Sequence, residues 1–349
     1  MSNLDITQKF KDSKFKNIFW FAVASLIFAA LLLAAEPSKI ISSITQAEPV
    51  YILAAFITGF MVINCWALNW FVFFKSLNID CSYFRTFHVF TAGQFFNNIT
   101  PLGRFGGQPI MAYLISKNSG STYEKALATV MSADLVTIIP MTLYITTGLT
   151  YLTTTATPSQ KVTTASLTLL GFLTLGILIG FTAWFKPGTI EKYSLKITNK
   201  TTQKLGKGEK IHQKINEKAE NWEKTLQTIG KHPKTLIQSL IITGSAFLFR
   251  MTTFYLILAS LGLQIHPLKI MLIIPLISFA SISPTPGGAG TYEAAMAATI
   301  ILLTNLNFAT ALTTTILYRI TTYWQTITIG YISTTTLGKI PSKKQIPQT

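Results

Sequence analysis

The chain's most informative segment is PTPGGAGTYE, from Pro284 to Glu293, because it interrupts an apolar region that extends over residues 270–303. An earlier apolar region, residues 82–116, is interrupted in the same way by TPLGRFG at Thr100–Gly106. Proline and glycine in the centre of an apolar run break a helix into two shorter pieces. Irregular backbone at membrane depth is tolerated only inside protein or beside a watery cavity. Each region is therefore predicted to be a re-entrant pair of half-helices, which we call a dip.

The composition indicates an integral membrane protein. Of the 349 residues, 49% are hydrophobic and only 12% are charged, whereas a soluble domain has about a quarter charged residues. This excludes a disordered chain, a coiled coil and an ordinary cytosolic enzyme. A spanning helix needs roughly 20 predominantly apolar residues, and six stretches satisfy this: 17–35, 50–74, 122–152, 165–185, 236–261 and 308–331. We expect an all-α polytopic membrane protein with about six spanning helices and two re-entrant helix pairs.

The lysines and arginines predict the orientation of the chain. With the N-terminus inside, 24 of them lie in segments that face the cytoplasm, and only Lys39, Lys161 and Lys269 lie in segments that face outside. Such an excess of positive charge is typical of cytoplasmic segments. We therefore expect a multi-pass protein of the cell membrane with both termini in the cytoplasm.

This topology divides the chain into two membrane halves. The predicted segments are a cytoplasmic N-terminus (1–16), a first membrane half with its dip at 82–116 (17–185), a basic connection (186–235), a second membrane half with its dip at 270–303 (236–331) and a cytoplasmic tail (332–349). The two dips would enter from opposite faces, and their turns share TP followed by glycines. Inverted repeats whose broken helices meet near the midplane are common in secondary transporters. We predict an inverted repeat, with accidental likeness of two short turns as the alternative.

The connection over residues 186–235 is strongly basic, with 12 lysines and 5 glutamates between Lys186 and Lys234. Apolar residues recur at helical spacing within it, which predicts an amphipathic helix that binds anionic lipid headgroups on the cytoplasmic leaflet. A solvated linker is the alternative. Nucleic acid is not an expected partner, because no aromatic stacking platform accompanies the lysines.

Arginine is rare in this chain, yet three of the four arginines lie within membrane segments: Arg104 in the first dip, Arg250 in the fifth span and Arg319 in the sixth. A charge at the bilayer centre costs at least about 2.5–3.5 kcal/mol. A guanidinium offers a planar bidentate fork that matches phosphate or carboxylate. We expect these three arginines to hold an anionic group of the substrate.

Two acids lie at similar depth, Asp134 in the third span and Glu293 at the start of the returning half-helix. The alternative to substrate binding is that they neutralise Arg250 and Arg319 internally. Three arginines and two acids would leave a net charge of +1 in the membrane segments, which an anionic substrate would balance.

A second candidate site for binding an anion is the glycine turn formed by Gly287, Gly288 and Gly290. They let backbone N–H groups turn toward a ligand at a helix N-terminus, which carries partial positive charge. Close packing of the turn against other helices is the alternative. The sequence has no P-loop, GxSxG or HExxH motif, and its four histidines and two cysteines lack metal-ligand spacing. We expect no cofactor, no metal and no catalytic residue.

The pattern P-G-G-x-G-x-x-E between two apolar half-helices resembles a signature of the flippase-like membrane family, UPF0104-type, that includes the transmembrane region of lysylphosphatidylglycerol synthases. NNITPLGRFGGQPIMAYL, from Asn97 to Leu114, resembles that family's N-terminal motif, and the resemblance extends over about residues 17–331. Family members often carry an acid where Gln108 stands and an arginine where Met111 stands, so the resemblance places Gln108 in the headgroup site but with altered chemistry. Bifunctional members add a soluble aminoacyl-transferase domain; only the short tail over 332–349 follows the last predicted span here, so we do not expect that activity.

The resemblance implies a membrane lipid as substrate, moved between leaflets as an anionic phospholipid or isoprenoid phosphate. A secondary transporter of a small anionic solute is the first alternative. A membrane-embedded lipid-modifying enzyme is the second, with Asp134 and Glu293 as its only intramembrane acids. The sequence leaves the oligomeric state open.

Overall fold

The computed structural model describes residues 3–100, 103–155, 160–185, 233–278, 283 and 285–339, and within these ranges it contains helices and no strand. The elements, in chain order, are α1 (Asn3–Ala34), α2 (Pro37–Gln46), α3 (Pro49–Ser76), α4 (Tyr83–Ile99), α5 (Gly103–Ser119), α6 (Tyr123–Val136), α7 (Ile138–Thr155), α8 (Gln160–Phe185), α11 (Pro233–Ser260), α12 (Pro267–Ile277), the 3₁₀ turn η1 (Pro286–Gly288), α13 (Thr291–Leu303), α14 (Phe308–Arg319), the π-helix η2 (Ile320–Trp324) and α15 (Gln325–Lys339).

Several of these helices are long and apolar enough to cross a membrane. Three qualify by length and composition, namely α3, the continuous stretch Tyr123–Thr155 and α11. The end of α1 and α2, bent by 80° relative to each other, would make a fourth. Large apolar side chains such as Leu53, Leu143, Phe172 and Ile241 are exposed on the outer helices, as expected where a protein faces lipid. The prediction of an all-α membrane protein is confirmed, whereas the count of six spans stays a prediction.

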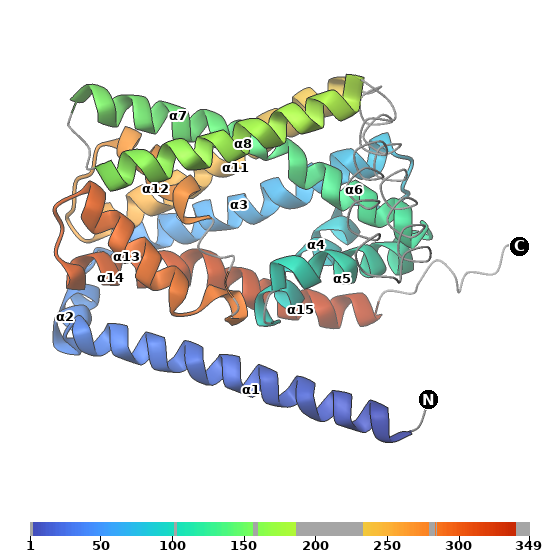
Figure 1. The fold of residues 1–349 in the computed structure, drawn as a ribbon, viewed down its shortest axis with the longest axis horizontal. Coiled ribbons are helices and arrows are strands. Elements are labelled where there is room, and N and C mark those ends of the chain that lie inside the picture. The colour runs from blue at the N-terminus through green and yellow to red at the C-terminus, as the bar shows by residue number, and fades with distance from the viewer. Residues whose placement is uncertain are drawn as a thin grey trace, which may run out of the picture.

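Each region with a broken apolar pattern forms a helical hairpin. The first hairpin is α4 followed by α5, and the second is α12 followed by η1 and α13. Figure 1 shows α4 and α5 at the end of the molecule near which α1 begins, and α12 and α13 at the opposite end. The two hairpins therefore enter the bundle from opposite ends, and η1 of the second contacts α4 of the first.

The two halves of the chain have the same order of helices at a nearly constant spacing. Helices α3 and α11 contain 28 residues each and begin at Pro49 and Pro233. Helices α4 and α12 begin at Tyr83 and Pro267, and their separation along the chain equals that of the first pair. The first half thus corresponds to α3–α7 and the second half to α11–α15.

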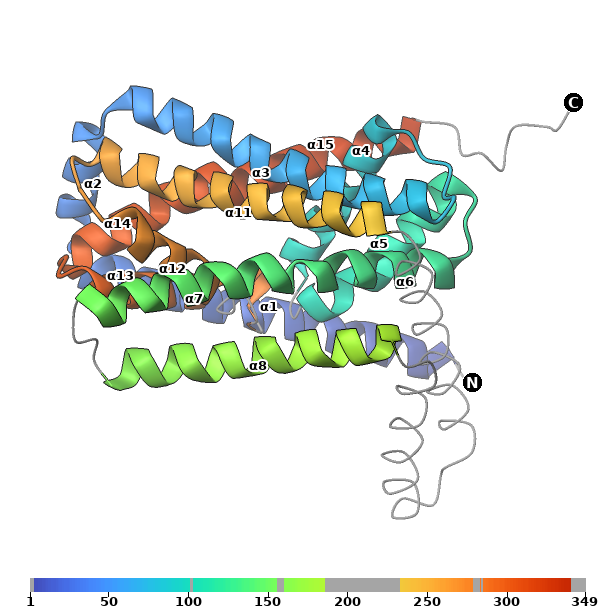
Figure 2. The same ribbon diagram turned by 90° about the horizontal axis from the view of Figure 1, so that it is seen from above.

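The contacts between helices follow the same correspondence. Helix α3 packs along α11, as seen from above in Figure 2. Helix α4 of the first half packs against α15 of the second, and α12 of the second half packs against α7 of the first. If the two halves are exchanged, the contact of α4 with α15 becomes the contact of α12 with α7, and the contact of α3 with α11 becomes itself. Because the hairpins also enter from opposite ends, the fold is an inverted repeat.

The helix that follows the hairpin is interrupted at an equivalent position in each half. Thr137 separates α6 from α7, and the π-helix around Thr322 separates α14 from α15. The two breaks are separated along the chain by nearly the same interval as the helix starts. Pro140 lies in the first turn of α7, whereas no proline or glycine lies in the π-helix; neither break was expected from the sequence. A π-helix inserts extra backbone into a helix and often lies at a functional site.

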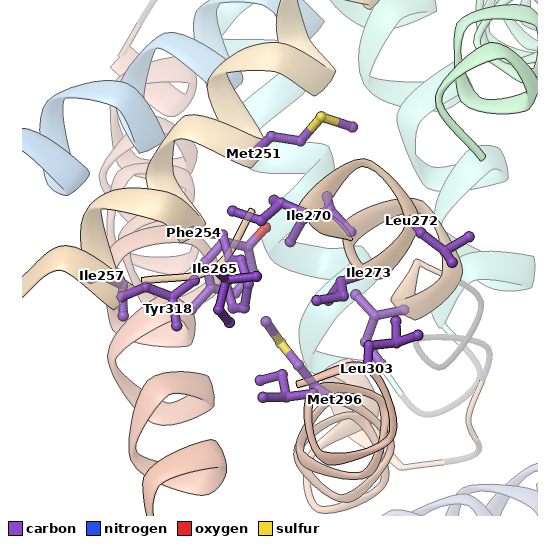
Figure 3. Close-up of a cluster of buried hydrophobic side chains, with 14 of the residues drawn as sticks. Met251, Phe254, Ile257, Ile265, Ile270, Leu272, Ile273, Met296, Leu303 and Tyr318 are labelled. Atoms are coloured by element: carbon purple, nitrogen blue, oxygen red, sulfur yellow. The ribbon is translucent and has the colours of Figure 1, made fainter. Parts of the chain in front are cut away.

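A cluster of buried apolar side chains holds the second hairpin in place. Figure 3 shows side chains from α11, α12, α13 and α14 that meet around Phe254, Ile273 and Met296. Each of these three is fully buried. Burial of such a side chain contributes about 1.5–3 kcal/mol, so the hairpin is anchored by packing as well as by polar contacts.

Two predictions concern parts of the chain outside the described residues. The amphipathic helix expected in the basic connection lies within residues 186–232, and the side chain of Arg104 on α5 is also outside the described part. The binding of anionic headgroups by that connection stays a prediction.

Candidate functional site

A cavity of about 440 Å³ lies where the two hairpins meet. Residues of both halves line it, and the polar and aromatic ones are Trp66, Trp70, Phe90, Gln94, Asn97, Asn98, Gln108, Asp134, Thr137, Arg250, Ser278, Ser283, Thr285, Tyr292, Tyr318, Arg319, Thr322, Tyr323 and Thr326. Six of the predicted site residues border the cavity directly: Gln108, Asp134, Arg250, Gly287, Gly288 and Arg319. Glu293 is not in the cavity wall but forms an ion pair with Arg319. The fold therefore gathers polar residues that lie far apart in the sequence.

Glu293 and Arg319 form a buried ion pair. Arg319 Nε lies 2.9 Å from Glu293 Oε1, and both side chains are only 6% exposed. The other carboxylate oxygen of Glu293 accepts a hydrogen bond from the Gly290 N–H at 2.7 Å. Glu293 lies in the first turn of α13, where a negative charge is favourable. This one carboxylate therefore links the turn of the second hairpin, helix α13 and helix α14.

The rest of the Arg319 guanidinium is also occupied by protein groups. Its two terminal nitrogens both donate to the Gly287 carbonyl oxygen at 3.2 Å. The rings of Tyr323 and Tyr292 lie 3.9 and 4.7 Å from the guanidinium carbon, within the range of cation–π attraction. In the structure, the charge of Arg319 is thus neutralised within the protein by Glu293.

Arg250 differs from Arg319 because no described carboxylate forms an ion pair with it. It projects from the middle of α11 and is half-buried. Its Nη1 lies 3.5 Å from the Ser278 Oγ, which makes a long hydrogen bond, and the hydroxyl of Tyr318 is a further polar neighbour. Both neighbours are neutral, so the positive charge of Arg250 faces the cavity without an ion-pair partner among the described residues.

A second polar pair joins the first hairpin to α6, the helix that follows it. Gln108 Nε2 on α5 donates to Asp134 Oδ2 on α6 at 2.9 Å. The interval along the chain from Gln108 to Glu293 equals the interval from Asp134 to Arg319. The two pairs therefore occupy equivalent places in the inverted repeat.

The glycines of the second turn allow close packing. Gly287, Gly288 and Gly290 have φ angles of 57°, 70° and 82°, in the left-handed region that favours glycine. A Cβ at Gly287 would overlap the ring of Tyr323, and one at Gly290 would lie 2.8 Å from Cβ of Ile27 on α1. The N–H groups of Gly288 and Gly290 are bonded within the hairpin, so a role of these glycines in holding a substrate stays a prediction.

Several cavity residues were missed by reading the sequence. Asn97 and Gln94 on α4 precede the first turn, and the tyrosines at 292, 318 and 323 surround the two arginines. The local signal was present, since Tyr292 lies inside the P-G-G-x-G-x-x-E pattern and Tyr318 directly precedes Arg319. Aromatic residues are common in membrane helices, however, so their position alone does not separate cavity walls from lipid-facing surface.

Comparison with known proteins identifies relatives along nearly the whole chain. The chain is 22% identical to a UPF0104 membrane protein of Methanothermobacter thermautotrophicus, over 95% of this chain and 98% of that protein. It is 27% identical to the UPF0104 membrane protein PH1989 of Pyrococcus horikoshii, over 86% of this chain and 91% of the relative. The family model described as the lysylphosphatidylglycerol synthase TM region matches residues 19–330, which include both hairpins and the cavity. The chain therefore belongs to the family of the lysylphosphatidylglycerol synthase transmembrane region.

Proposed function

We propose that the protein moves an anionic amphipathic lipid, of the phospholipid or isoprenoid-phosphate type, between the leaflets of the membrane. The headgroup would enter the cavity between the two hairpins while its tails stay in the bilayer. The observation that carries this proposal is Arg250, a cation at the cavity wall whose hydrogen-bond neighbours among the described residues are neutral. Membership in a family named for a lipid synthase supports a lipid as the substrate.

Arg250 is suited to bind a phosphate group. A guanidinium donates two parallel hydrogen bonds to phosphate oxygens, and the attraction is stronger away from bulk water, where the effective dielectric constant is lower. The cost of holding a charge at this depth falls when an anion binds beside it. Arg319 and Glu293 would shape the cavity, because their charges already neutralise each other.

The inverted repeat supports transport rather than static binding. Broken helices that meet near the midplane are where secondary transporters bind their substrates. The two halves make equivalent contacts with each other, as expected of a transporter whose halves open in turn toward opposite leaflets. No nucleotide motif is present in the sequence, and we therefore propose passive or ion-coupled movement.

The test is transfer of phosphatidylglycerol with a fluorescent tail in liposomes that contain the purified protein. We expect Arg250→Ala to lower the transfer rate at least about tenfold, since removal of a charged hydrogen-bond partner costs about 1.5–3 kcal/mol. Arg85→Ala is the matched control, because Arg85 lies outside the cavity at the start of α4 and donates to the Asn118 carbonyl at 3.2 Å. Equal transfer by wild type and Arg250→Ala would refute the proposal.

The same preparation separates the alternatives. Uptake of soluble glycerol phosphate without lipid transfer would indicate a solute transporter. Cleavage or modification of the labelled headgroup would indicate an enzyme, in which Asp134 and Glu293 are the acids to substitute first.

A further inference from the structure

Tyr318 on α14 is a large side chain that is only 1% exposed. Its ring packs edge-to-face against Phe254 of α11, with the ring centres 5.6 Å apart (Figure 3). Its hydroxyl oxygen is buried and makes no hydrogen bond of regular geometry to a described residue. A buried hydroxyl without a partner is unfavourable, and a phenylalanine would fill the same space without that cost. The hydroxyl therefore calls for a role other than packing.

The charged group beside this hydroxyl is the guanidinium of Arg250. Arg250 and Phe254 are four residues apart and lie on one face of α11, next to the hydroxyl and the ring of Tyr318 respectively. A guanidinium has five N–H donors and no acceptor, so a hydrogen bond between the two side chains runs from Arg250 to the Tyr318 oxygen. The long bond to Ser278 is the one hydrogen bond that Arg250 makes to a described residue, which leaves N–H groups for Tyr318 and for an anion.

The ring and the backbone of Tyr318 are both held in place. The ring is enclosed by apolar side chains, and the carbonyl oxygen accepts a hydrogen bond from the Thr322 hydroxyl at 2.7 Å. The next residue, Arg319, is fixed by its ion pair with Glu293. The Tyr318 oxygen is therefore a fixed point, to which a long and flexible arginine side chain can be attached.

We infer that Tyr318 is a positioning residue, whose hydroxyl oxygen accepts a hydrogen bond from Arg250 and holds the guanidinium in the orientation that binds an anion. Tyr318 borders the cavity, but its hydroxyl has almost no exposed surface, so it acts through Arg250 and not on the anion itself. A side chain that is already held in its bound orientation loses less freedom when the ligand binds. This inference rests on the proposed function, because Arg250 is the residue that carries that proposal.

The test is Tyr318→Phe, which removes the hydroxyl and keeps the ring. The rate of transfer of fluorescent phosphatidylglycerol would be measured in liposomes of neutral lipid over a range of labelled-lipid fractions, which separates the apparent KM from the maximal rate. We expect the apparent KM to rise about twofold to tenfold, as for the loss of one net hydrogen bond. The unfolding temperature should not fall, because the hydroxyl that is removed has no regular partner among the described residues.

Combination with Arg250→Ala tests whether the hydroxyl acts through Arg250. Tyr318→Phe should have no further effect in the Arg250→Ala background, because no guanidinium is left to position. The dissociation constant of phosphatidylglycerol in nanodiscs of neutral lipid gives the same comparison where transfer by Arg250→Ala is too slow to measure. An equal effect of Tyr318→Phe in both backgrounds would overturn the inference.

Tyr144 on α7 supplies the matched control. Its hydroxyl donates to the Gly244 carbonyl at 3.1 Å, outside the cavity. Tyr144→Phe removes a hydroxyl that has a partner, so it should lower the unfolding temperature and leave the apparent KM unchanged. If Tyr318→Phe does not fold, Tyr318→Met repeats the comparison with an apolar side chain that adapts to its surroundings.

The outcomes separate this inference from the proposed function. An unchanged apparent KM in Tyr318→Phe, with transfer still slowed by Arg250→Ala, would overturn the role of Tyr318 and leave the proposed function in place. A lower unfolding temperature with an unchanged apparent KM would give Tyr318 a purely structural role and would overturn the inference as well. Transfer that is indifferent to Arg250→Ala would overturn the proposed function itself.

Discussion

Gln108 and Glu293 occupy the same position in the two halves of the molecule, each as the eighth residue after the threonine of its hairpin turn. Each bonds a residue of the helix that follows: Gln108 donates to Asp134 at 2.9 Å, and Glu293 lies 2.9 Å from Arg319. The two equivalent pairs differ in environment. Glu293 and Arg319 are buried, whereas Gln108 is half-buried and Asp134 is exposed. The repeat is therefore symmetric in position and asymmetric in burial, which leads to different expectations for the two pairs.

Breaking the buried pair should strongly destabilise the protein. Glu293→Gln leaves the Arg319 charge buried without its carboxylate, and removal of one partner of a buried ion pair costs about 3–5 kcal/mol. We expect a clear fall of the thermal unfolding temperature in detergent. Glu36→Gln is the control, because it breaks an ion pair with Lys39 whose side chains are about 60% exposed, and exposed pairs contribute only about 0–1 kcal/mol. Similar stability losses in the two variants would contradict the conclusion that Glu293 and Arg319 form a buried ion pair.

Breaking the equivalent pair between Gln108 and Asp134 should have a small effect on stability. Gln108→Leu removes one hydrogen bond to Asp134 at a site that retains access to solvent, so the loss should be about 0.5–1.5 kcal/mol. Comparison with Glu293→Gln under the same unfolding conditions tests the asymmetry of the repeat. A loss as large as that of Glu293→Gln would show that the first pair is buried in the state that dominates in solution.

The sequence predicted both hairpins because proline and glycine mark backbone breaks independently of tertiary structure. Glu293 and Arg319 were recognised as candidates for an internal pair on the basis of charge balance alone. Which arginine pairs with Glu293 could not be predicted, because the answer depends on α14, rather than α11, being the helix beside the first turn of α13. The burial of these side chains depends on the same packing.

The break around Thr322 could not be predicted either, because residues 308–329 contain no proline or glycine. The break at Thr137 has a local signal that was missed, since Pro140 follows three residues later and proline disturbs a helix on its N-terminal side. Their equivalent positions became evident only from the spacing of the helices in the structure. The position of Asn97 in the cavity wall was missed because an asparagine before a turn is usually a cap.

Gly287→Ala should disturb the site more than an ordinary helix substitution. Gly287 has a φ of 57°, and a Cβ there would overlap Tyr323, whose ring lies 3.9 Å from the Arg319 guanidinium. Backbone strain of this kind costs about 1–3 kcal/mol, and displacement of Tyr323 should also slow lipid transfer. Gly244→Ala is the matched control: apart from its own helix backbone and chain neighbours, no atom lies within 4 Å of a Cβ at that position, so a gain of about 0.5–1 kcal/mol is expected. Unfolding temperatures and transfer rates of the two variants check this, and unchanged values for Gly287→Ala would argue against the tight turn.

The orientation predicted from the lysines can be tested on the two ends of the bundle. Ser121 lies in the connection between α5 and α6, and Gln264 lies in the connection between α11 and α12, near the opposite end. After replacement of Cys65 and Cys81 by serine, a membrane-impermeant maleimide added to intact cells should label Gln264→Cys and should label Ser121→Cys only after permeabilisation. The physical reason is the excess of lysine and arginine on the side of Ser121, which is retained in the cytoplasm. Labelling with the opposite pattern would invert the topology, and labelling of both positions in intact cells would show that the hairpins do not enter from opposite faces.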